Sequence, residues 1–256
     1  MIIFLYSLSD LSVTILFSTM IALIFAAAPF LRMWLMGQIS EIHSEIARTT
    51  MTTVTGFTGA VLAFSLVQAQ GNLRSVEKTV AAEALQLNQM DRLVESFGDK
   101  AASIRNAIHA YAVSVVTQEW PKLSEHSRSP QTDDLFRALS QEVLALQPTP
   151  GRDTVIFSDL IKSLDQLAES RQDLVSASDL GLPPIFWEVI MFLTLLLVAF
   201  CAFLETERAL YLGGLGAGLG LLIALVFIFD QPFLGNVSVT PDPIVRMLHV
   251  TSTRLG

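Results

Sequence analysis

The stretch TTMTTVTGFTGAVLAFSLVQAQGNL, residues 49–73, decides the fold class of this chain. It contains no charged residue, and a helix needs roughly 20 mainly apolar residues to cross the hydrocarbon layer of a bilayer. Three further stretches are also free of charge: 11–31, 189–204 and 209–229. The 189–204 stretch reaches spanning length once residues 185–187 are included. Because a charge at bilayer depth costs several kcal/mol, these four stretches predict four transmembrane helices.

The polar middle of the chain, residues 71–181, holds 11 Lys/Arg and 16 Asp/Glu, a net charge of −5. Apolar residues recur there at helical spacing, so we expect a small, water-facing helical domain. The chain is therefore predicted to be an all-α polytopic membrane protein, with four transmembrane helices split two and two around this domain. The predicted parts are residues 1–70 (helices at about 11–35 and 49–70 with an amphipathic connector), the domain at 71–181, a helical hairpin at 182–230 and a tail at 231–256.

The second predicted span is unusually rich in hydroxyl and small residues for a helix that contacts lipid. Such residues favour close helix packing or exposure to a water-filled path. Two stripes at helical spacing are candidates for a pore wall; the first contains Phe57, Val61 and Phe64, and the second Thr55, Thr58 and Ser65. Ordinary packing between helices is the competing interpretation of the aromatic stripe.

The fourth predicted span opens with GGLGAGLG at residues 213–220. Gly214 with Gly218, and Gly216 with Gly220, have the spacing of small residues that lets two helix backbones approach closely. The pattern also resembles a glycine-rich phosphate-binding loop, but helix packing is favoured because no strand precedes the glycines and no lysine follows them. We therefore expect these four glycines to lie at helix contacts.

The acidic residues nearest the predicted membrane segments are Glu188, Glu205 and Glu207. They are candidates for a ring of charge at a pore mouth, with exposed boundary residues as the alternative. The four histidines are far apart and none has metal-ligand spacing, and no common catalytic motif is present. We expect no enzymatic activity, catalytic residue, metal site or cofactor. The net charge of −8 argues against a nucleic-acid partner.

Several local strings resemble a bacterial family of unknown function described as bestrophin-like: Tyr111, EWP at 119–121, DQPFLG at 230–235 and VTP at 239–241. The wider resemblance to bestrophins implies a homo-oligomeric channel, pentameric by analogy, in a bacterial inner membrane with the middle domain and both termini cytosolic. It also implies that the second span lines the pore and that Phe57, Val61 and Phe64 form an apolar neck. No dense acidic cluster follows the fourth span, which argues against calcium gating of the eukaryotic kind.

The favoured hypothesis is a channel for inorganic ions that is either cation-leaning or poorly selective, because an acidic domain in each copy would concentrate cations near the entry. Its expected partners are membrane lipid, inorganic ions and further copies of the chain. A non-enzymatic membrane sensor or scaffold with a helical bundle domain is the alternative from another class. A non-conducting, lipid-associated assembly is a third.

Overall fold

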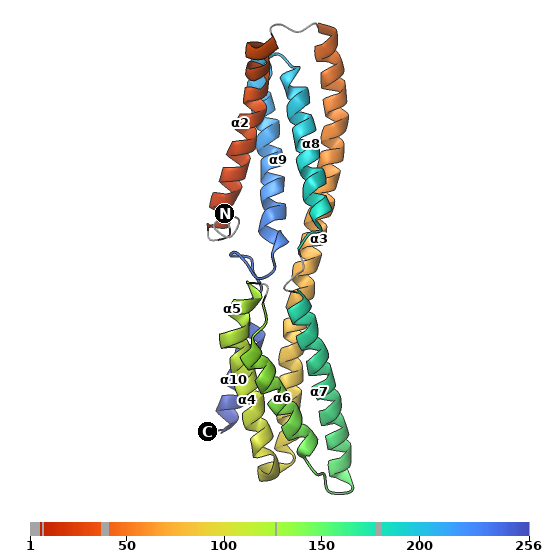
Figure 1. The fold of residues 1–256 in the computed structure, drawn as a ribbon, viewed down its shortest axis with the longest axis vertical. Helices are drawn as coiled ribbons and strands as arrows, with labels where there is room; N and C mark the ends of the chain where they lie inside the picture. Colours follow the sequence, from red (N-terminus) through yellow and green to blue (C-terminus); the bar gives the residue numbers. More distant parts are fainter. Residues whose placement is uncertain (1–5, 7, 37–40, 126, 178–180, 256) are drawn as a thin grey trace. The chain divides into compact units, whose positions relative to one another are not determined.

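The computed structural model describes residues 6, 8–36, 41–125, 127–177 and 181–255, and every regular element in these ranges is helical (Figure 1). The chain divides into two units, Met1–Leu73 with Gly181–Ser238 and Arg74–Leu180 with Val239–Gly256. Four of the helices are long and apolar enough to cross a membrane. The predicted all-α fold with four candidate membrane helices is confirmed.

The first unit contains the four candidate membrane helices: α2 (Asp10–Met36), the first part of α3 (Glu41–Glu95), α8 (Pro184–Ala202) and α9 (Ala209–Asp230), with the short 3-10 helix η3 (Thr206–Arg208) before α9. A 55-residue helix such as α3 is roughly 80 Å long, whereas the hydrocarbon core is about 30 Å thick. Only its charge-free part, residues 49–73, suits the bilayer.

The amphipathic connector predicted between the first two spans is not a separate element within the described residues. Residues 41–48 form the first turns of α3, and residues 37–40 lie outside the described ranges. Pro29 lies inside α2, which is a single helix from Asp10 to Met36.

Close packing of α2 on α9 organises the first unit, and two of the predicted glycines make it possible. A Cβ at Gly220 would lie 2.6 Å from the Phe17 carbonyl oxygen, and one at Gly216 would lie 2.8 Å from that of Ile21. The hydroxyl of Ser18 donates to the Ala217 carbonyl at 2.8 Å. The missing side chains therefore let the two backbones approach to a distance that no other residue type would allow.

The other two predicted packing glycines, Gly214 and Gly218, lie on a different face of α9. A Cβ at either position would meet no atom within 4 Å. Among the described residues, close helix contacts therefore involve the Gly216 and Gly220 pair and not the Gly214 and Gly218 pair.

The second unit contains the rest of α3 and the helices that follow it: η1 (Gly98–Ala101), α4 (Ala102–Ser114), η2 (Val115–Glu119), α5 (Trp120–Leu123), α6 (Pro130–Ala145), α7 (Arg152–Ala177) and α10 (Asp242–Leu255). Apolar side chains at helical spacing fill its core, among them Val80, Ile108, Leu139 and Leu167, each at most 2% exposed. The Ser129 side chain caps α6 by accepting a hydrogen bond from the Thr132 N–H at 3.4 Å.

A wide helical turn before a proline, and the assignment of the C-terminal segment, are two local features of the second unit. The wide π-type turn η2 ends at Glu119, two residues before Pro121, whose ring would clash with the carbonyl of residue 117 in a regular helix. The predicted tail at 231–256 divides between the units, because residues from Val239 onward belong to the second unit and include α10.

Candidate functional site

The part of α3 between residues 49 and 73 has one face packed inside the first unit and one face exposed. Thr58, Leu62 and Ser65 are at most 1% exposed. Phe57 and Phe64 are 66% and 59% exposed. The two stripes singled out in the sequence therefore have different surroundings: most of the hydroxyl stripe packs against other helices, and the aromatic stripe is open.

Hydroxyl groups along α3 donate to the backbone carbonyl of the residue four positions earlier. Thr58 donates to Val54 at 2.8 Å, and Ser65 to Val61 at 2.9 Å. Thr49 and Thr52, which are exposed at the beginning of the helix, do the same to Glu45 at 3.1 Å and Arg48 at 3.0 Å. Thr55 is half-buried. In the four hydrogen-bonded residues, which do not include Thr55, the hydroxyl proton therefore points to a backbone carbonyl of the same helix.

The aromatic stripe borders a shallow apolar groove of about 430 Å³ between α3 and α8. Phe64 stacks on Phe186 of α8 with ring centroids 5.9 Å apart. Phe57 and the half-buried Val61 also line the groove. The three predicted neck residues thus share one surface, which combines large exposed rings with an almost wholly apolar lining.

The three acidic candidates near the membrane are not gathered in one place within the chain. Glu188 is exposed in the second turn of α8, whereas Glu205 and Glu207 follow the other end of that helix. Glu205 accepts a hydrogen bond from Arg208 Nε at 3.0 Å. Within the described ranges, no three His, Cys, Asp or Glu side chains are placed to hold a metal ion.

Asp230, the first residue of the DQPFLG string, links the end of α9 to the start of α8. Its Oδ1 accepts the backbone N–H of Leu182 at 2.6 Å, and its Oδ2 accepts the indole N–H of Trp187 at 3.2 Å. The side chain is therefore an acceptor for two donors near the re-entry of the chain into the first unit.

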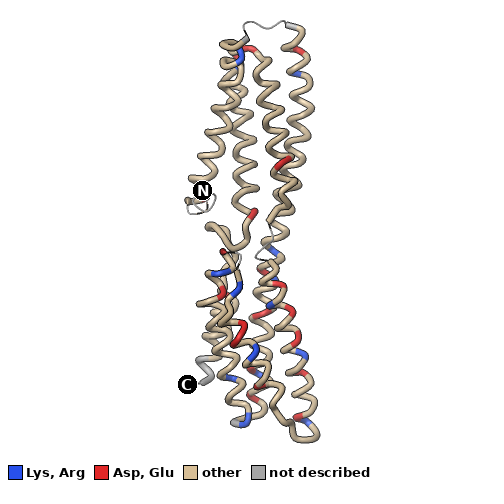
Figure 2. Tube along the Cα trace, in the orientation of Figure 1, with Lys and Arg blue, Asp and Glu red and all other residues tan. Residues whose placement is uncertain are grey.

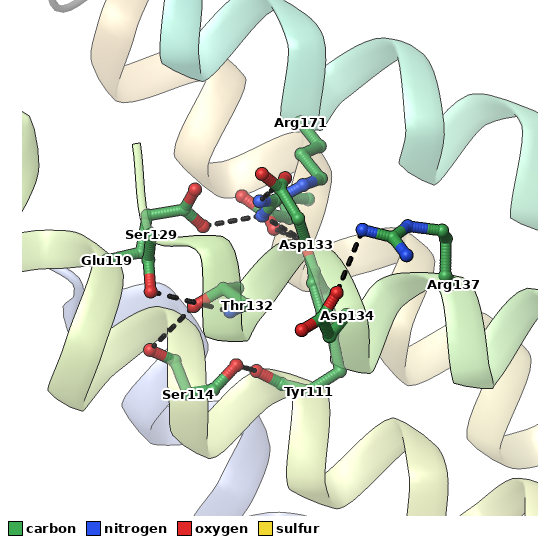
Figure 3. Close-up of polar contacts among 10 residues, drawn as sticks. Tyr111, Ser114, Glu119, Ser129, Thr132, Asp133, Asp134, Arg137 and Arg171 are labelled. Carbon is green, nitrogen blue, oxygen red and sulfur yellow. Dashed lines mark hydrogen bonds and ion pairs between the residues drawn. The ribbon is translucent and has the colours of Figure 1, made fainter. Parts of the chain in front are cut away.

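Two of the other residues that carry the bestrophin-like resemblance, Tyr111 and Glu119, belong to a buried polar network in the second unit (Figure 3). The Tyr111 hydroxyl donates to Glu83 Oε1 at 2.5 Å. Arg171 Nη1 pairs with Glu119, and Arg171 Nη2 pairs with Asp133 at 2.7 Å. The same guanidinium reaches the Tyr111 hydroxyl at 3.4 Å. The network therefore joins α3, α4, η2, α6 and α7 through five side chains.

Burial sets the protonation of this network. Loss of hydration raises the pKa of Glu83 from 4.5 to about 7, against the opposing effect of the Tyr111 hydrogen bond. Burial, and then the nearby charge of Glu83, raise the pKa of Tyr111 well above 10. Glu83 Oε2 is buried and has no hydrogen-bond partner among the described residues. The neutral carboxyl form of Glu83 is therefore favoured below pH 7, and the Arg171 guanidinium pairs with the two other carboxylates of the network.

Sequence reasoning missed Glu83 and Arg171, although the apolar pattern contains a signal for both. Glu83 follows Val80 by three positions and precedes Leu87 by four, so it lies on the buried stripe of α3. Arg171 lies between Leu167 and Leu174 in the same way on α7. A charged residue at an apolar position of a helical repeat predicts a buried partner of opposite charge or a hydrogen-bonding group.

The fold and this arrangement define a polytopic, all-helical membrane protein with a second helical unit built around a polar core. A family profile for the bestrophin-like domain matches residues 18–244. The chain belongs to the bestrophin-like family.

Solved structures with low sequence identity to this chain share its fold. Two crystal structures of point variants of a bacterial bestrophin homologue from Klebsiella pneumoniae match with 15% and 17% identity and TM-scores of 0.59 and 0.58. The first match covers 94% of this chain and 97% of that one, and the second covers 97% of both. A third crystal structure, described as that of a membrane protein, matches with 14% identity and a TM-score of 0.56, covering 97% and 98% of the two chains. No curated protein matches the chain.

Proposed function

We propose that this chain forms a homo-oligomeric channel for inorganic ions, in which copies of α3 surround the conducting path. Family membership and the shared fold support the proposal. The observation that carries it is the exposed aromatic pair Phe57 and Phe64 on the helix richest in hydroxyl and small residues. In an oligomer, rings of such side chains make an apolar neck that controls passage by dewetting.

The neck is assigned to Phe57, Val61 and Phe64 on one surface of α3. Thr58 and Ser65 are assigned to packing within the chain, because both are buried and donate to their own helix. Thr55 is half-buried and stays at the edge of the proposed wall. Five copies are proposed by analogy with bestrophins, in a bacterial inner membrane with the second unit and both termini in the cytosol.

We propose a preference for cations from the charge of the second unit. Residues 71–181 carry −5, and the C-terminal segment of that unit adds Asp242, Arg246 and Arg254, which changes the net charge to −4. Five copies would place a charge of about −20 near the entry of the path, which attracts cations within a Debye length of about 8 Å at physiological salt. Glu188, Glu205 and Glu207 would add to this field if copies bring them to a mouth of the pore.

Planar bilayers containing the purified full chain test the channel and its neck. Phe57→Ala and Phe64→Ala should each raise the single-channel conductance several-fold, because a wider and less apolar constriction wets more easily. Phe192→Ala is the matched control, since Phe192 is 64% exposed on α8 and does not border the groove. Its conductance should equal that of the wild type.

Three outcomes would contradict the proposal at different levels. Absence of current from wild-type protein that is shown to be inserted would reject the channel. A conductance equal to that of the wild type in Phe57→Ala and Phe64→Ala, as in the control Phe192→Ala, would reject the neck. A reversal potential at the chloride limit under a KCl gradient would reject the preference for cations.

A further inference from the structure

A small polar cavity of about 250 Å³ lies in the first unit, between the first turns of α3 and the connection from α8 to α9. It is lined by Ser44, Glu45, Arg48, Glu205 and Arg208. Figure 2 shows charged residues at the start of α3 and at this connection, at one end of the first unit. The cavity therefore brings two guanidinium groups, two carboxylates and a hydroxyl together from segments that are far apart in the sequence.

The cavity lies at one boundary of the predicted membrane spans. Arg48 directly precedes the charge-free stretch 49–73, and Arg208 directly precedes the charge-free stretch 209–229. Arginines at the ends of spans reach the lipid headgroups, and basic pockets between transmembrane helices bind headgroup phosphates. On the membrane side of Arg208, Leu210 and Tyr211 are 83% and 78% exposed. Headgroup chemistry and apolar surface are therefore neighbours at this position.

The cavity is on the side of α3 opposite to the proposed neck. Arg48 precedes Phe57 by nine residues in one continuous α-helix. Nine residues are about 2.5 turns, so the two side chains leave the helix in opposite directions. In the proposed channel, the cavity therefore faces away from the conducting path, which favours lipid over a permeating ion as its occupant.

The charges of the lining match a ligand that carries both signs. Two arginines and two glutamates sum to zero, so a simple anion or cation would be repelled by one pair as it is attracted by the other. Glu205 accepts a hydrogen bond from Arg208 Nε at 3.0 Å. A guanidinium has further N–H donors on its Nη atoms, so Arg208 can keep this bond and still donate to a phosphate.

We propose that this cavity binds the headgroup of a phospholipid that carries both a phosphate and a primary ammonium, the class of phosphatidylethanolamine. The phosphate would accept hydrogen bonds from Arg48 and Arg208, and the ammonium would donate to Glu45 and Glu205. Both contacts are charge-assisted, and a guanidinium matches the geometry of a phosphate. The cavity is smaller than the roughly 300–1,000 Å³ of drug-sized ligand pockets, so it holds the headgroup while the acyl chains lie on the exposed apolar side chains of the spans.

Native mass spectrometry of the purified full chain tests this site with three lipids that have the same oleoyl chains. The wild type should retain dioleoylphosphatidylethanolamine more strongly than the glycerol lipid, which has no ammonium, and the choline lipid, whose ammonium has no N–H to donate. Arg48→Gln should lower retention of the ethanolamine and glycerol lipids about tenfold, because both lose a charge-assisted hydrogen bond to phosphate. Glu45→Gln should lower retention of the ethanolamine lipid about tenfold and should not lower that of the glycerol lipid.

Two variants are matched controls for the removal of charge. Glu207→Gln removes an exposed carboxylate from the same connection as Glu205, at a position that does not line the cavity. Arg74→Gln removes an exposed cation that directly follows the other end of the charge-free stretch 49–73. Both should retain all three lipids as the wild type does, and every variant should elute as the wild type does in size-exclusion chromatography.

Four results would overturn the proposal. Equal retention of the three lipids by the wild type would show that no headgroup is selected. A loss in Glu207→Gln or Arg74→Gln equal to that in Glu45→Gln or Arg48→Gln would show that lipid is held by boundary charge in general. Unchanged retention in both cavity variants would place the lipid elsewhere. Displacement of the lipid by an equal concentration of soluble glycerophosphoethanolamine would assign the cavity to a soluble ligand. Because the readout is bound lipid and not current, failure here leaves the proposed channel untouched.

Discussion

Replacing Glu83 by glutamine should make the stability of the second unit less dependent on pH. In the folded chain burial raises the pKa of Glu83 from 4.5 to about 7, so the folded state keeps a proton that the unfolded chain loses between these values. The wild type therefore loses stability as the pH rises from 4.5 to about 7. Since a tenfold difference in proton affinity is worth about 1.36 kcal/mol, the loss approaches about 3 kcal/mol. Glutamine keeps an acceptor for the Tyr111 hydroxyl and cannot ionise.

Thermal unfolding of the detergent-solubilised full chain at a series of pH values measures this effect. Glu83→Gln should unfold near the wild-type temperature at pH 4.5 and at a distinctly higher temperature at pH 8. Glu77→Gln is the control, because Glu77 is exposed on the same helix, and it should follow the wild type at every pH. The reasoning is refuted if Glu83→Gln and the wild type lose the same stability between pH 4.5 and 8.

Two further pairs of substitutions test the packing and the polar core. Gly220→Ala should destabilise the chain by about 1–3 kcal/mol, because the added Cβ would overlap the backbone of α2. Gly218→Ala, the control, should be neutral or stabilising. Equal losses of stability in chemical denaturation would contradict the contact between Gly220 and α2. Arg171→Met should cost about 3–5 kcal/mol by leaving the buried Glu119 without its ion-pair partner. Arg137→Met, at a 71% exposed position, should cost about 1 kcal/mol or less. Similar unfolding midpoints for the two variants would argue against an ionised Arg171–Glu119 pair.

The membrane helices were predictable because charge is excluded over long stretches. Residues 49–73 contain no charge, and this alone predicts a span regardless of its partners. The ends of α3 were not predictable in this way, since helical spacing continues on both sides and the helix includes residues 41–48 and 74–95. A charge-free run indicates which residues can lie in the bilayer. It does not indicate where the helix begins and ends.

Which face of a span is buried depends on partners that are distant in sequence. Gly216 and Gly218 have equivalent spacing, yet only Gly216 meets α2, because the direction from which α2 approaches is not encoded near the glycines. The same holds for Thr58, which is buried, and Phe57 beside it, which is exposed. Glu83 differs from these, since its place on an apolar stripe was already visible in the sequence.

The direction of the hydroxyl bonds along α3 has a consequence for the sign of an ion near this helix. At Thr49 and Thr52 the proton points back to a carbonyl of the preceding turn, so the side-chain oxygen offers only its lone pairs outward. A potassium ion can exchange part of its water for such an oxygen, whereas chloride needs a proton donor and meets none at these two groups. In the proposed channel, a threonine-rich helix of this kind would favour cations over anions even at positions that carry no charge.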